Sequence, residues 1–284
     1  RSGDGYSKSE HAKISVIYGT IFKNNNALFG GALHMNNTAA FLLQETKFVA
    51  NKVSESGGAI YSTQIGQCSI LKSFFIQNKA ERKGGGIYFE TGRIKGVRFI
   101  KISVGIINFQ RVRFIKNSAP VAGGLYFARA VNYNFKIGVM NVQRVTFTKN
   151  SASVVGGIAM HNLLSCSICM SLFVGQSIQD IYMSFIGAAS LYRVVFTKNC
   201  TSENCQAFIS KTCNNILVAN SSFVEHNSAF YGMNVSHAEI VNIYGVSFVT
   251  TCSHSAMDRG RGIKMQGITK CTLAHSMLRG NHIN

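Results

Sequence analysis

Side chains that could perform catalysis are sparse in this sequence. It has 11 Asp and Glu against 29 Lys and Arg, which gives a formal net charge of +18. Glycoside hydrolysis needs two carboxylates about 5–10 Å apart, and calcium-dependent lyases need clustered acids. The three aspartates, Asp4, Asp180 and Asp258, are scattered, and the eight histidines show no metal-ligand spacing. We therefore expect no enzymatic activity, no metal and no cofactor.

Cysteine is the second residue type with reactive potential, and seven of the eight cysteines follow residue 160. Cys68 and Cys166 stand at an apolar position of the repeat described below, so we expect both to be buried. Cys166 and Cys169 match half of a zinc site, but no second C-x-x-C or H-x-x-x-H pair follows. Disulfides that stabilise the later part of the chain are one hypothesis. The candidates, with the pairing left open, are Cys200, Cys205, Cys213, Cys252 and Cys271.

Two short motifs alternate along the chain and have to be interpreted before any single residue. One is F-x-x-N, as in Phe48 to Asn51, and the other is a glycine pair followed by an apolar residue, as in Gly57 to Ile60. Further glycine pairs start at residues 30, 85, 123 and 156. Successive motif phenylalanines, degenerate copies included, are 23–39 residues apart. A period of roughly 20–50 residues is typical of solenoid proteins.

Alignment of the copies on phenylalanine indicates short strands. Apolar residues recur seven, five and two positions before Phe, as Ile107, Phe109 and Val112 do before Phe114. A spacing of two is typical of a strand with one buried face, and the odd step from five to two requires a bend. The glycine pair opens another strand. The sequence therefore predicts an all-β fold, a right-handed single-stranded parallel β-helix of about ten or eleven coils with three short strands per coil.

This interpretation divides the chain simply. We expect residues 1–13 to form an N-terminal tail or cap and residues 14–284 to form a single β-helix domain. The coils should be regular to about residue 160 and divergent and cysteine-richer after it. Extra residues near 91–104 and 129–136 should emerge as loops on one side, although residues 97–101 are alternatively a degenerate coil. No run of 18 apolar residues indicates a transmembrane segment.

The repeat gives two columns of residues a structural role. Stacked asparagines at one corner can form an amide ladder, in which each side chain bonds to the next. The asparagines of this ladder are Asn25, Asn51, Asn78, Asn117, Asn150 and Asn199. The phenylalanines should form one stack inside the coil, made of Phe22, Phe48, Phe75, Phe114, Phe147, Phe173, Phe196, Phe223 and Phe248. Both motifs are thus expected to build the coil and not to contact a ligand.

The ordered alternation of F-x-x-N and G-G-A-[IL] resembles the repeats of the polymorphic outer-membrane protein family. The resemblance covers residues 14–160 well and residues 161–284 loosely. It implies a β-helical passenger region that is displayed at the cell surface and is linked to adhesion. Similar repeats also occur in surface proteins of some eukaryotes.

Basic residues recur at two positions of the repeat. Arg111, Arg144 and Arg193 stand three residues before Phe, and Lys116, Lys149 and Lys198 stand two residues after it. Equal positions in successive coils form a column on the outside of a β-helix. Such columns could bind a sulfated or carboxylated polysaccharide or another acidic partner. The alternative interpretation is a solvated face that prevents sideways aggregation. Nucleic acid is not expected as a partner, because no recognised module is present.

Glycosylation sequons stand at four asparagines. If the source is eukaryotic, glycans are predicted on Asn36, Asn220 and Asn234, whereas Asn199 should be held in the ladder.

The sequence as a whole predicts an extracellular or cell-surface protein with a structural or adhesive role and no catalysis. Its partners would be an acidic polysaccharide, a host or cell-surface molecule, or further copies of itself stacked end to end as a fibre. The alternative is a β-helix that binds or cleaves polysaccharide. In the first interpretation the basic columns and loops are only displayed, whereas in the alternative they belong to a site that binds or cleaves polysaccharide.

Overall fold

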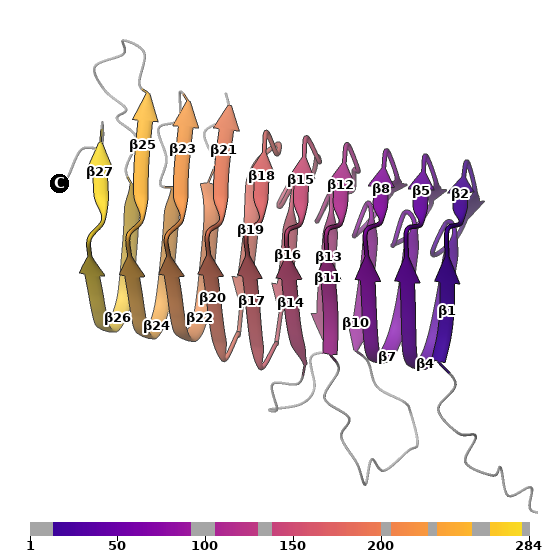
Figure 1. Cartoon of the computed structure of the whole chain (residues 1–284), viewed down its shortest axis with the longest axis horizontal. Coiled ribbons are helices and arrows are strands. Elements are labelled where there is room, and N and C mark those ends of the chain that lie inside the picture. The colour runs from indigo at the N-terminus through magenta and orange to yellow at the C-terminus, as the bar shows by residue number, and fades with distance from the viewer. Residues whose placement is uncertain are drawn as a thin grey trace, which may run out of the picture.

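The computed structural model describes residues 14–91, 106–129, 138–199, 206–226, 232–251 and 262–279. Every secondary-structure element assigned to these residues is a β-strand. The strands form three sheets, and neighbouring strands in each sheet are parallel. Figure 1 shows the coils side by side along the long axis, from the first coil in indigo to the last in yellow. The chain is therefore a parallel β-helix. The predicted tail or cap at residues 1–13 lies outside the described ranges.

One sheet carries the motif phenylalanine of each coil, and we call it the Phe sheet. Its ten strands are β2 (Ile21–Lys23), β5 (Lys47–Val49), β8 (Phe74–Ile76), β12 (Arg113–Ile115), β15 (Thr146–Thr148), β18 (Leu172–Val174), β21 (Val195–Asn199), β23 (Ser222–His226), β25 (Ser247–Thr251) and β27 (Met277–Arg279). Ten strands enclose nine full turns, so the described part of the chain has slightly fewer coils than the ten or eleven predicted.

A second sheet has 14 strands and divides into two arms in the middle of the molecule. Its strands are β1 (Ile14–Tyr18), β4 (Leu33–Gln44), β7 (Ile60–Leu71), β10 (Ile87–Thr91), β11 (Ile106–Gln110), β13 (Leu125–Arg129), β14 (Val139–Gln143), β16 (Ile158–His161), β17 (Ser165–Cys169), β19 (Gln179–Ser184), β20 (Ala188–Tyr192), β22 (Gln206–Ala219), β24 (Met233–Tyr244) and β26 (Ile263–Ala274). The first part of β7 pairs with β10 and its last part with β11. The long strand β22 rejoins the arms by pairing with both β19 and β20.

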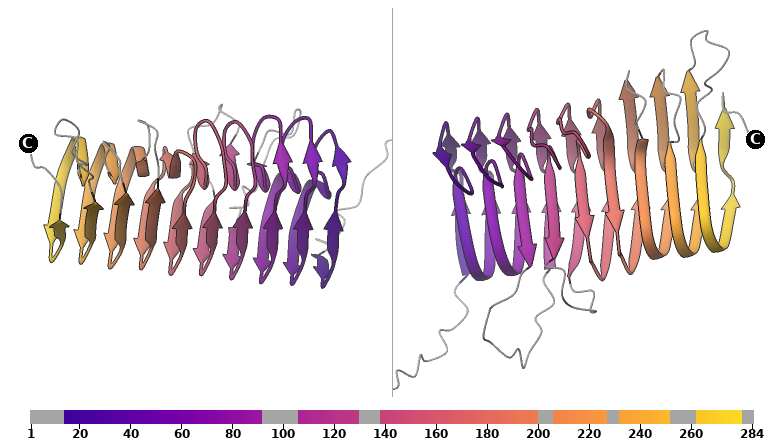
Figure 2. Two further views of the ribbon diagram at one scale, coloured as in Figure 1. Left: turned by 90° about the horizontal axis from the view of Figure 1, so that it is seen from above. Right: turned by 180° about the vertical axis from the view of Figure 1, so that it is seen from behind.

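The two arms follow different parts of the repeat. The Gly arm (β10, β13, β16 and β19) begins at or just after the position of the glycine pairs, and the pre-Phe arm (β11, β14, β17 and β20) precedes the Phe sheet in each coil. A short third sheet of β3 (Asn26–Ala27), β6 (Lys52–Val53) and β9 (Lys79–Ala80) lies at a corner of the first coils. The two views of Figure 2 show that the strands of successive coils keep this order along the stack.

The insertions predicted near 91–104 and 129–136 fall almost wholly outside the described residues. The strands on either side of the first insertion nevertheless pair directly with each other, β8 with β12 and β10 with β13. No coil lies between these strands. Residues 97–101, which the alternative interpretation treats as a degenerate coil, lie outside the described residues.

The interior is a column of aromatic rings surrounded by aliphatic side chains. The nine motif phenylalanines pair in register, and consecutive ring centroids are 4.6–5.2 Å apart with nearly parallel rings. Alternation along each strand turns every second residue inward, so that Ile107 and Phe109 of β11 are buried. Because this register repeats coil after coil, each core residue packs against its equivalent in the next coil.

The asparagine corner is held together by side-chain amides. Asn51, Asn78 and Asn117 are fully buried, and the Nδ2 of each donates to the Oδ1 of the next ladder residue at 2.9–3.0 Å. The same nitrogen also donates to a Phe carbonyl of the preceding coil, for example from Asn117 to Phe75 at 2.8 Å. Each Oδ1 in turn accepts a backbone N–H as well. The buried amides are therefore paired, which offsets the cost of removing them from water.

The described ladder extends from Asn25 to Gln176. Gln176 accepts from Asn150 at 3.1 Å and donates to the carbonyls of Phe147 and Val174. The backbone of Asn199 lies in β21 and pairs with that of His226, and the side chain of Asn199 lies outside the described parts of the chain. In the earlier coils a residue with φ between 49° and 60° turns the chain two positions after Phe, from Asn24 to Gly175. No such residue follows Phe196 in the described part of β21, so the turn that places Asn in the ladder is missing.

The glycine pairs are required by close packing between coils. A Cβ on Gly58 would lie 2.1 Å from the carbonyl oxygen of Gly85, and one on Gly85 would lie 2.5 Å from that of Gly123. On Gly124 a Cβ would also lie 2.9 Å from the ring of Phe147. The backbone of one coil thus occupies the space that a side chain would need. Loss of the glycine pairs after Gly157 coincides with loss of the asparagine corner.

Replacing one ladder amide should destabilise the fold far more than replacing an exposed one. Asn78→Ala removes four side-chain hydrogen bonds at a buried site, and we expect the free energy of unfolding to fall by at least about 3 kcal/mol. Asn141→Ala is the matched control, because this exposed amide makes one bond to Asn108, and its change should stay within about 0.5 kcal/mol. Urea unfolding followed by circular dichroism measures both. Equal midpoints for the two variants would contradict the ladder.

Candidate functional site

A left-handed residue turns the chain three positions before each of the nine motif phenylalanines and three positions before Leu278, which follows them in the Phe sheet. These ten residues have φ between 46° and 62° and are Gly19, Glu45, Lys72, Arg111, Arg144, Met170, Arg193, Asn220, Gly245 and His275. The N–H groups of the first nine donate to a carbonyl of the next coil, for example from Arg111 to Gln143 at 3.0 Å. We call this column the first corner. Since the backbone bonds fix the turn, the side chains of successive coils lie one strand spacing apart, about 4.8 Å.

The predicted arginines of the first corner are exposed and lack acidic neighbours. Arg111, Arg144 and Arg193 are all exposed. Between residues 106 and 219, the described residues include one acid, Asp180, and it is buried. Arg193 lies over its neighbour Tyr192, with the guanidinium carbon 5.1 Å from the ring centroid. In this part of the chain, the first corner therefore presents cations that no described carboxylate neutralises.

The first coils show a different arrangement of charge. Lys72 pairs with Glu45 at 3.1 Å, Lys79 with Glu81 at 2.9 Å and Arg82 with Glu55 at 2.8 Å. Hydrogen bonds from Tyr18 and Lys72 to Glu45 lower the pKa of that carboxyl below its ordinary value. These three ion pairs lie before Thr91, whereas the described residues between 106 and 219 include no exposed acid, so charge is balanced at one end of the stack and unbalanced in its middle.

The second basic column is shorter than predicted. Lys116 and Lys149 are exposed at left-handed turns two residues after Phe. Lys198 does not occupy this corner, because β21 continues through it in pairing with Glu225 of β23. The side chain of Lys198 lies outside the described parts of the chain. The column therefore contains two of its three predicted members.

Sequence analysis missed one cation that lies between the two columns. Arg113 stands one residue before Phe114 on β12, points outward, and has its guanidinium carbon 5.5 Å from the ring centroid of Phe74 in the previous coil. The signal that could have identified it is strand alternation, because the residues on either side of a buried Phe face solvent. Arg111, Arg113, Lys116, Arg144 and Lys149 together form what we call the basic face.

The predicted glycosylation sites differ in accessibility. Asn220 is exposed at the first corner, and Asn36 is exposed while accepting a hydrogen bond from Thr63 at 2.8 Å. Asn234 is half-buried, and its Nδ2 donates to Gln206 at 3.1 Å. These positions favour Asn220 and Asn36 as acceptors, and glycosylation itself stays a prediction.

No disulfide joins any two of the five described cysteines, Cys68, Cys166, Cys169, Cys213 and Cys271. Of the predicted candidates, Cys213 is buried within β22 and Cys271 is exposed on β26. Cys200, Cys205 and Cys252 lie outside the described residues. Cys213 and Cys271 are therefore not joined to each other, and the disulfide hypothesis for the remaining candidates stays a prediction. Cys68 and Cys166 are buried in the inward column, as their position in the repeat predicted.

Groups suited to catalysis are not assembled in the described part of the chain. Asp180 is buried in β19, and Asp4 and Asp258 fall outside the described residues. Cys166 points into the core while Cys169, three residues on, is half-buried. Among the described residues, no three His, Cys, Asp or Glu side chains group as a metal site.

One comparison with known proteins identifies the repeat. The family model described as a Chlamydia polymorphic membrane protein repeat matches residues 72–90. The match contains Phe75, Asn78 and the pair Gly85–Gly86, which form the stacked ring, the ladder amide and the close-packed corner described above. Residues 72–90 are thus similar to a polymorphic-membrane-protein repeat. They form part of a β-helix, as the resemblance implied.

This repeat family is associated with the outer membrane and cell surface, which is consistent with the predicted location. Neither a curated protein nor a solved structure matches the chain. In the parts of the chain that the structure describes, there is no helix with the length and apolar character needed to cross a membrane.

Thiol labelling should separate the buried from the accessible cysteines. Burial raises the pKa of Cys68 and Cys166 well above the ordinary thiol value, so both should resist iodoacetamide in the folded protein at pH 8. Cys271 and the partly exposed Cys169 should react under the same conditions. Peptide mass spectrometry before and after denaturation reports each site. Labelling of Cys68 as fast as Cys271 would contradict the inward column.

Proposed function

We propose that this chain is a non-catalytic, surface-displayed adhesive β-helix that binds a linear acidic polysaccharide along its first corner. The observation that carries the proposal is the row of Arg111, Arg144 and Arg193, which are exposed at equivalent turns and have no described acid beside them. A polyanion that runs along the stack would meet this row without bending. The surface association of the repeat family is compatible with such a role.

The chemistry of the row suits sulfate or carboxylate groups. Guanidinium groups can bind such anions through two parallel hydrogen bonds. Arg111 and Arg144 belong to adjacent coils and are thus about one strand spacing apart, while Met170 separates Arg144 from Arg193 by two spacings, about 10 Å. Lys116, Arg113 and Lys149 widen the basic face next to this row. The face offers several anion contacts in a line, which is what a repeating acidic polymer requires.

The left-handed backbone conformation at the first corner supports a functional role for the arginine side chains. A left-handed conformation costs about 1–2 kcal/mol for an ordinary residue, and Gly or Asn adopts it more easily. Arg or Lys nevertheless stands at four of the ten positions. Strain of this kind is often retained where a side chain has a role. The exposed cations are therefore better explained by a ligand than by the turn itself.

The alternative, a solvated face that prevents aggregation, is supported less well. The first coils show a balanced surface of that type, where Lys72, Lys79 and Arg82 pair with glutamates. Solubility is served by mixed charges of both signs. The middle coils lack acids at the surface among their described residues. This contrast within one molecule favours a partner that supplies the negative charge.

Binding to immobilised heparin, a sulfated polysaccharide, tests the proposal. The variant with Arg111, Arg144 and Arg193 all changed to Ser should bind roughly a hundredfold more weakly at low salt, about 1 kcal/mol for each lost contact. The control changes Lys23, Lys47 and Lys52 to Ser, which removes the same charge from exposed positions in the first coils. That control should keep most of the affinity.

Three outcomes would contradict the proposal or a part of it. Retention of the arginine variant at the salt concentration that releases the natural chain would exclude the row as the binding site. Equal weakening of both variants would show that net charge alone is responsible. Heparin that is shortened after incubation with the natural chain would contradict the non-catalytic part.

A further inference from the structure

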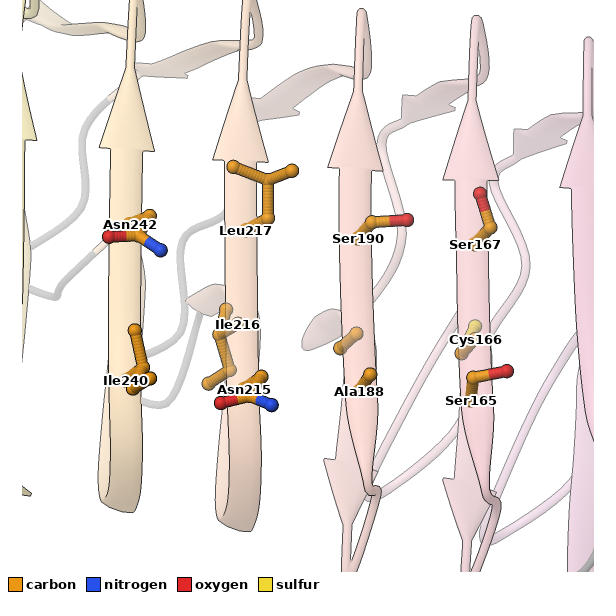
Figure 3. Close-up of a pocket in the computed structure, with 11 residues that line it drawn as sticks. Ser165, Cys166, Ser167, Ala188, Ser190, Asn215, Ile216, Leu217, Ile240 and Asn242 are labelled. Atoms are coloured by element: carbon orange, nitrogen blue, oxygen red, sulfur yellow. The ribbon is translucent and has the colours of Figure 1, made fainter.

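A shallow depression of about 470 Å³ lies on the outer face of the pre-Phe arm, and nothing above accounts for it. Its lining comes from four adjacent strands, β17, β20, β22 and β24. Figure 3 shows Ser165 and Ser167 on one strand, Ser190 on the next, and Asn215 and Asn242 beyond them. A volume of this size is within the usual range for small-molecule sites, about 300–1,000 Å³.

The depression forms because two successive coils carry short side chains at positions where neighbouring coils carry larger ones. Ser167 and Ser190 follow Asn141 in the same outward column, and Leu217 comes next. Ser165 and Ala188 form a second short pair beside them, and Asn215 follows. The floor is therefore made of small residues, and one end is raised by the exposed Leu217.

The polar groups in the depression are not used by the fold. Asn141 donates to Asn108 at 2.9 Å, and Gln110 and Gln143 bond at 3.4 Å on the same face of earlier coils. By contrast, among the described residues no hydrogen bond is formed by the side chains of Ser165, Ser167, Ser190, Asn215 and Asn242. These hydroxyl and amide groups can both donate and accept, as sugar hydroxyls do.

The depression adjoins the first corner. Tyr192 follows Ser190 by two residues on β20 and so faces the same side, and it is 41% exposed. Arg193 is the next residue and belongs to the arginine row. A polysaccharide that contacts Arg144 and Arg193 would thus have sugar rings or branches within reach of the serines, and Tyr192 and Leu217 offer apolar surface for the C–H face of a sugar.

We propose that this depression is a sugar-binding subsite for the acidic polysaccharide, in which serine and asparagine side chains bind ring hydroxyls while the arginine row binds the charged groups. The inference rests on the proposed function and adds a distinct requirement to it. The ligand must be a carbohydrate, because a polyanion without sugar rings would use the arginines and leave the depression empty.

Two probes of similar charge separate the subsite from the arginine row. A heparin hexasaccharide carries sugar rings, whereas inorganic polyphosphate does not. Changing both Ser167 and Ser190 to Phe fills the depression and should weaken hexasaccharide binding about tenfold, as expected for one or two lost hydrogen bonds, with polyphosphate binding unchanged. Ser69→Phe is the control, because Ser69 occupies the same outward column three coils earlier. Calorimetry measures each affinity.

A milder variant tests whether the Phe substitutions act through an effect on folding. Changing Ser167 and Ser190 to Ala removes the hydroxyls without adding bulk and should weaken hexasaccharide binding about threefold. Unchanged hexasaccharide affinity in the Phe variant would overturn the subsite and leave the arginine row standing. Equal loss of both probes in that variant would also overturn it. Loss of neither probe in the triple arginine variant would instead overturn the proposed function.

Discussion

In-register stacking is the constraint on which the rest of the structure depends. Each position of the repeat has its equivalent as a neighbour about one strand spacing above and below. A residue type is therefore suitable only if it packs well against itself. Phenylalanine satisfies this condition by ring stacking, and asparagine does so because its amide both donates and accepts. Glycine satisfies it where two backbones approach too closely for a Cβ. The two sequence motifs are consequences of this one geometric rule.

The same rule explains why the coil changes shape after Gln176. Glutamine at this position uses its amide to accept from Asn150 and to donate to two carbonyls, as a ladder residue does. The backbone of the next coil does not make the left-handed turn at this corner. Its Phe strand lengthens from three residues in β18 to five in β21, and the backbone bonds of β21 with β23 take over the connection between coils. The phenylalanine stack continues through the change, which keeps the two halves on one axis.

Sequence alone could predict the features that repeat and could not predict those that depend on local backbone shape. The fold class follows from the spacing of Phe, Asn and Gly, because each must recur to stack. The corner at residue 199 is different. Asn199 matches the F-x-x-N motif, but the left-handed turn that precedes the ladder asparagines in earlier coils is absent from β21. For the same reason, the backbone of Lys198 continues β21 and does not form the corner at which Lys116 and Lys149 lie.

Pairing among the candidate disulfide cysteines had no sequence signal, because a cysteine count does not distinguish an apolar inward residue from a crosslink. Cys68 and Cys166 stand in the same column as Phe41 and Ile107, so they serve there as small core residues. The depression beside Tyr192 had no sequence signal either. It arises from the absence of bulk in two adjacent coils, Ser165 to Ser167 and Ala188 to Ser190, and becomes visible only when their register is known.

Surface display follows from the same architecture. Positions that turn outward at equivalent corners form straight rows, so a few substitutions per coil can create a line of cations or a patch of hydroxyls without disturbing the core. The most direct test of this account is therefore the spacing between equivalent outward residues. Nitroxide labels can be attached through unnatural amino acids at two pairs of positions. Ser69 and Ser190 are separated by four coils and by 121 residues of sequence, whereas Asn141 and Asn242 are separated by four coils and by 101 residues. Pulsed electron resonance should give the same narrow distance for both pairs, about 19 Å between backbones, whereas two different or broad distances would contradict in-register stacking.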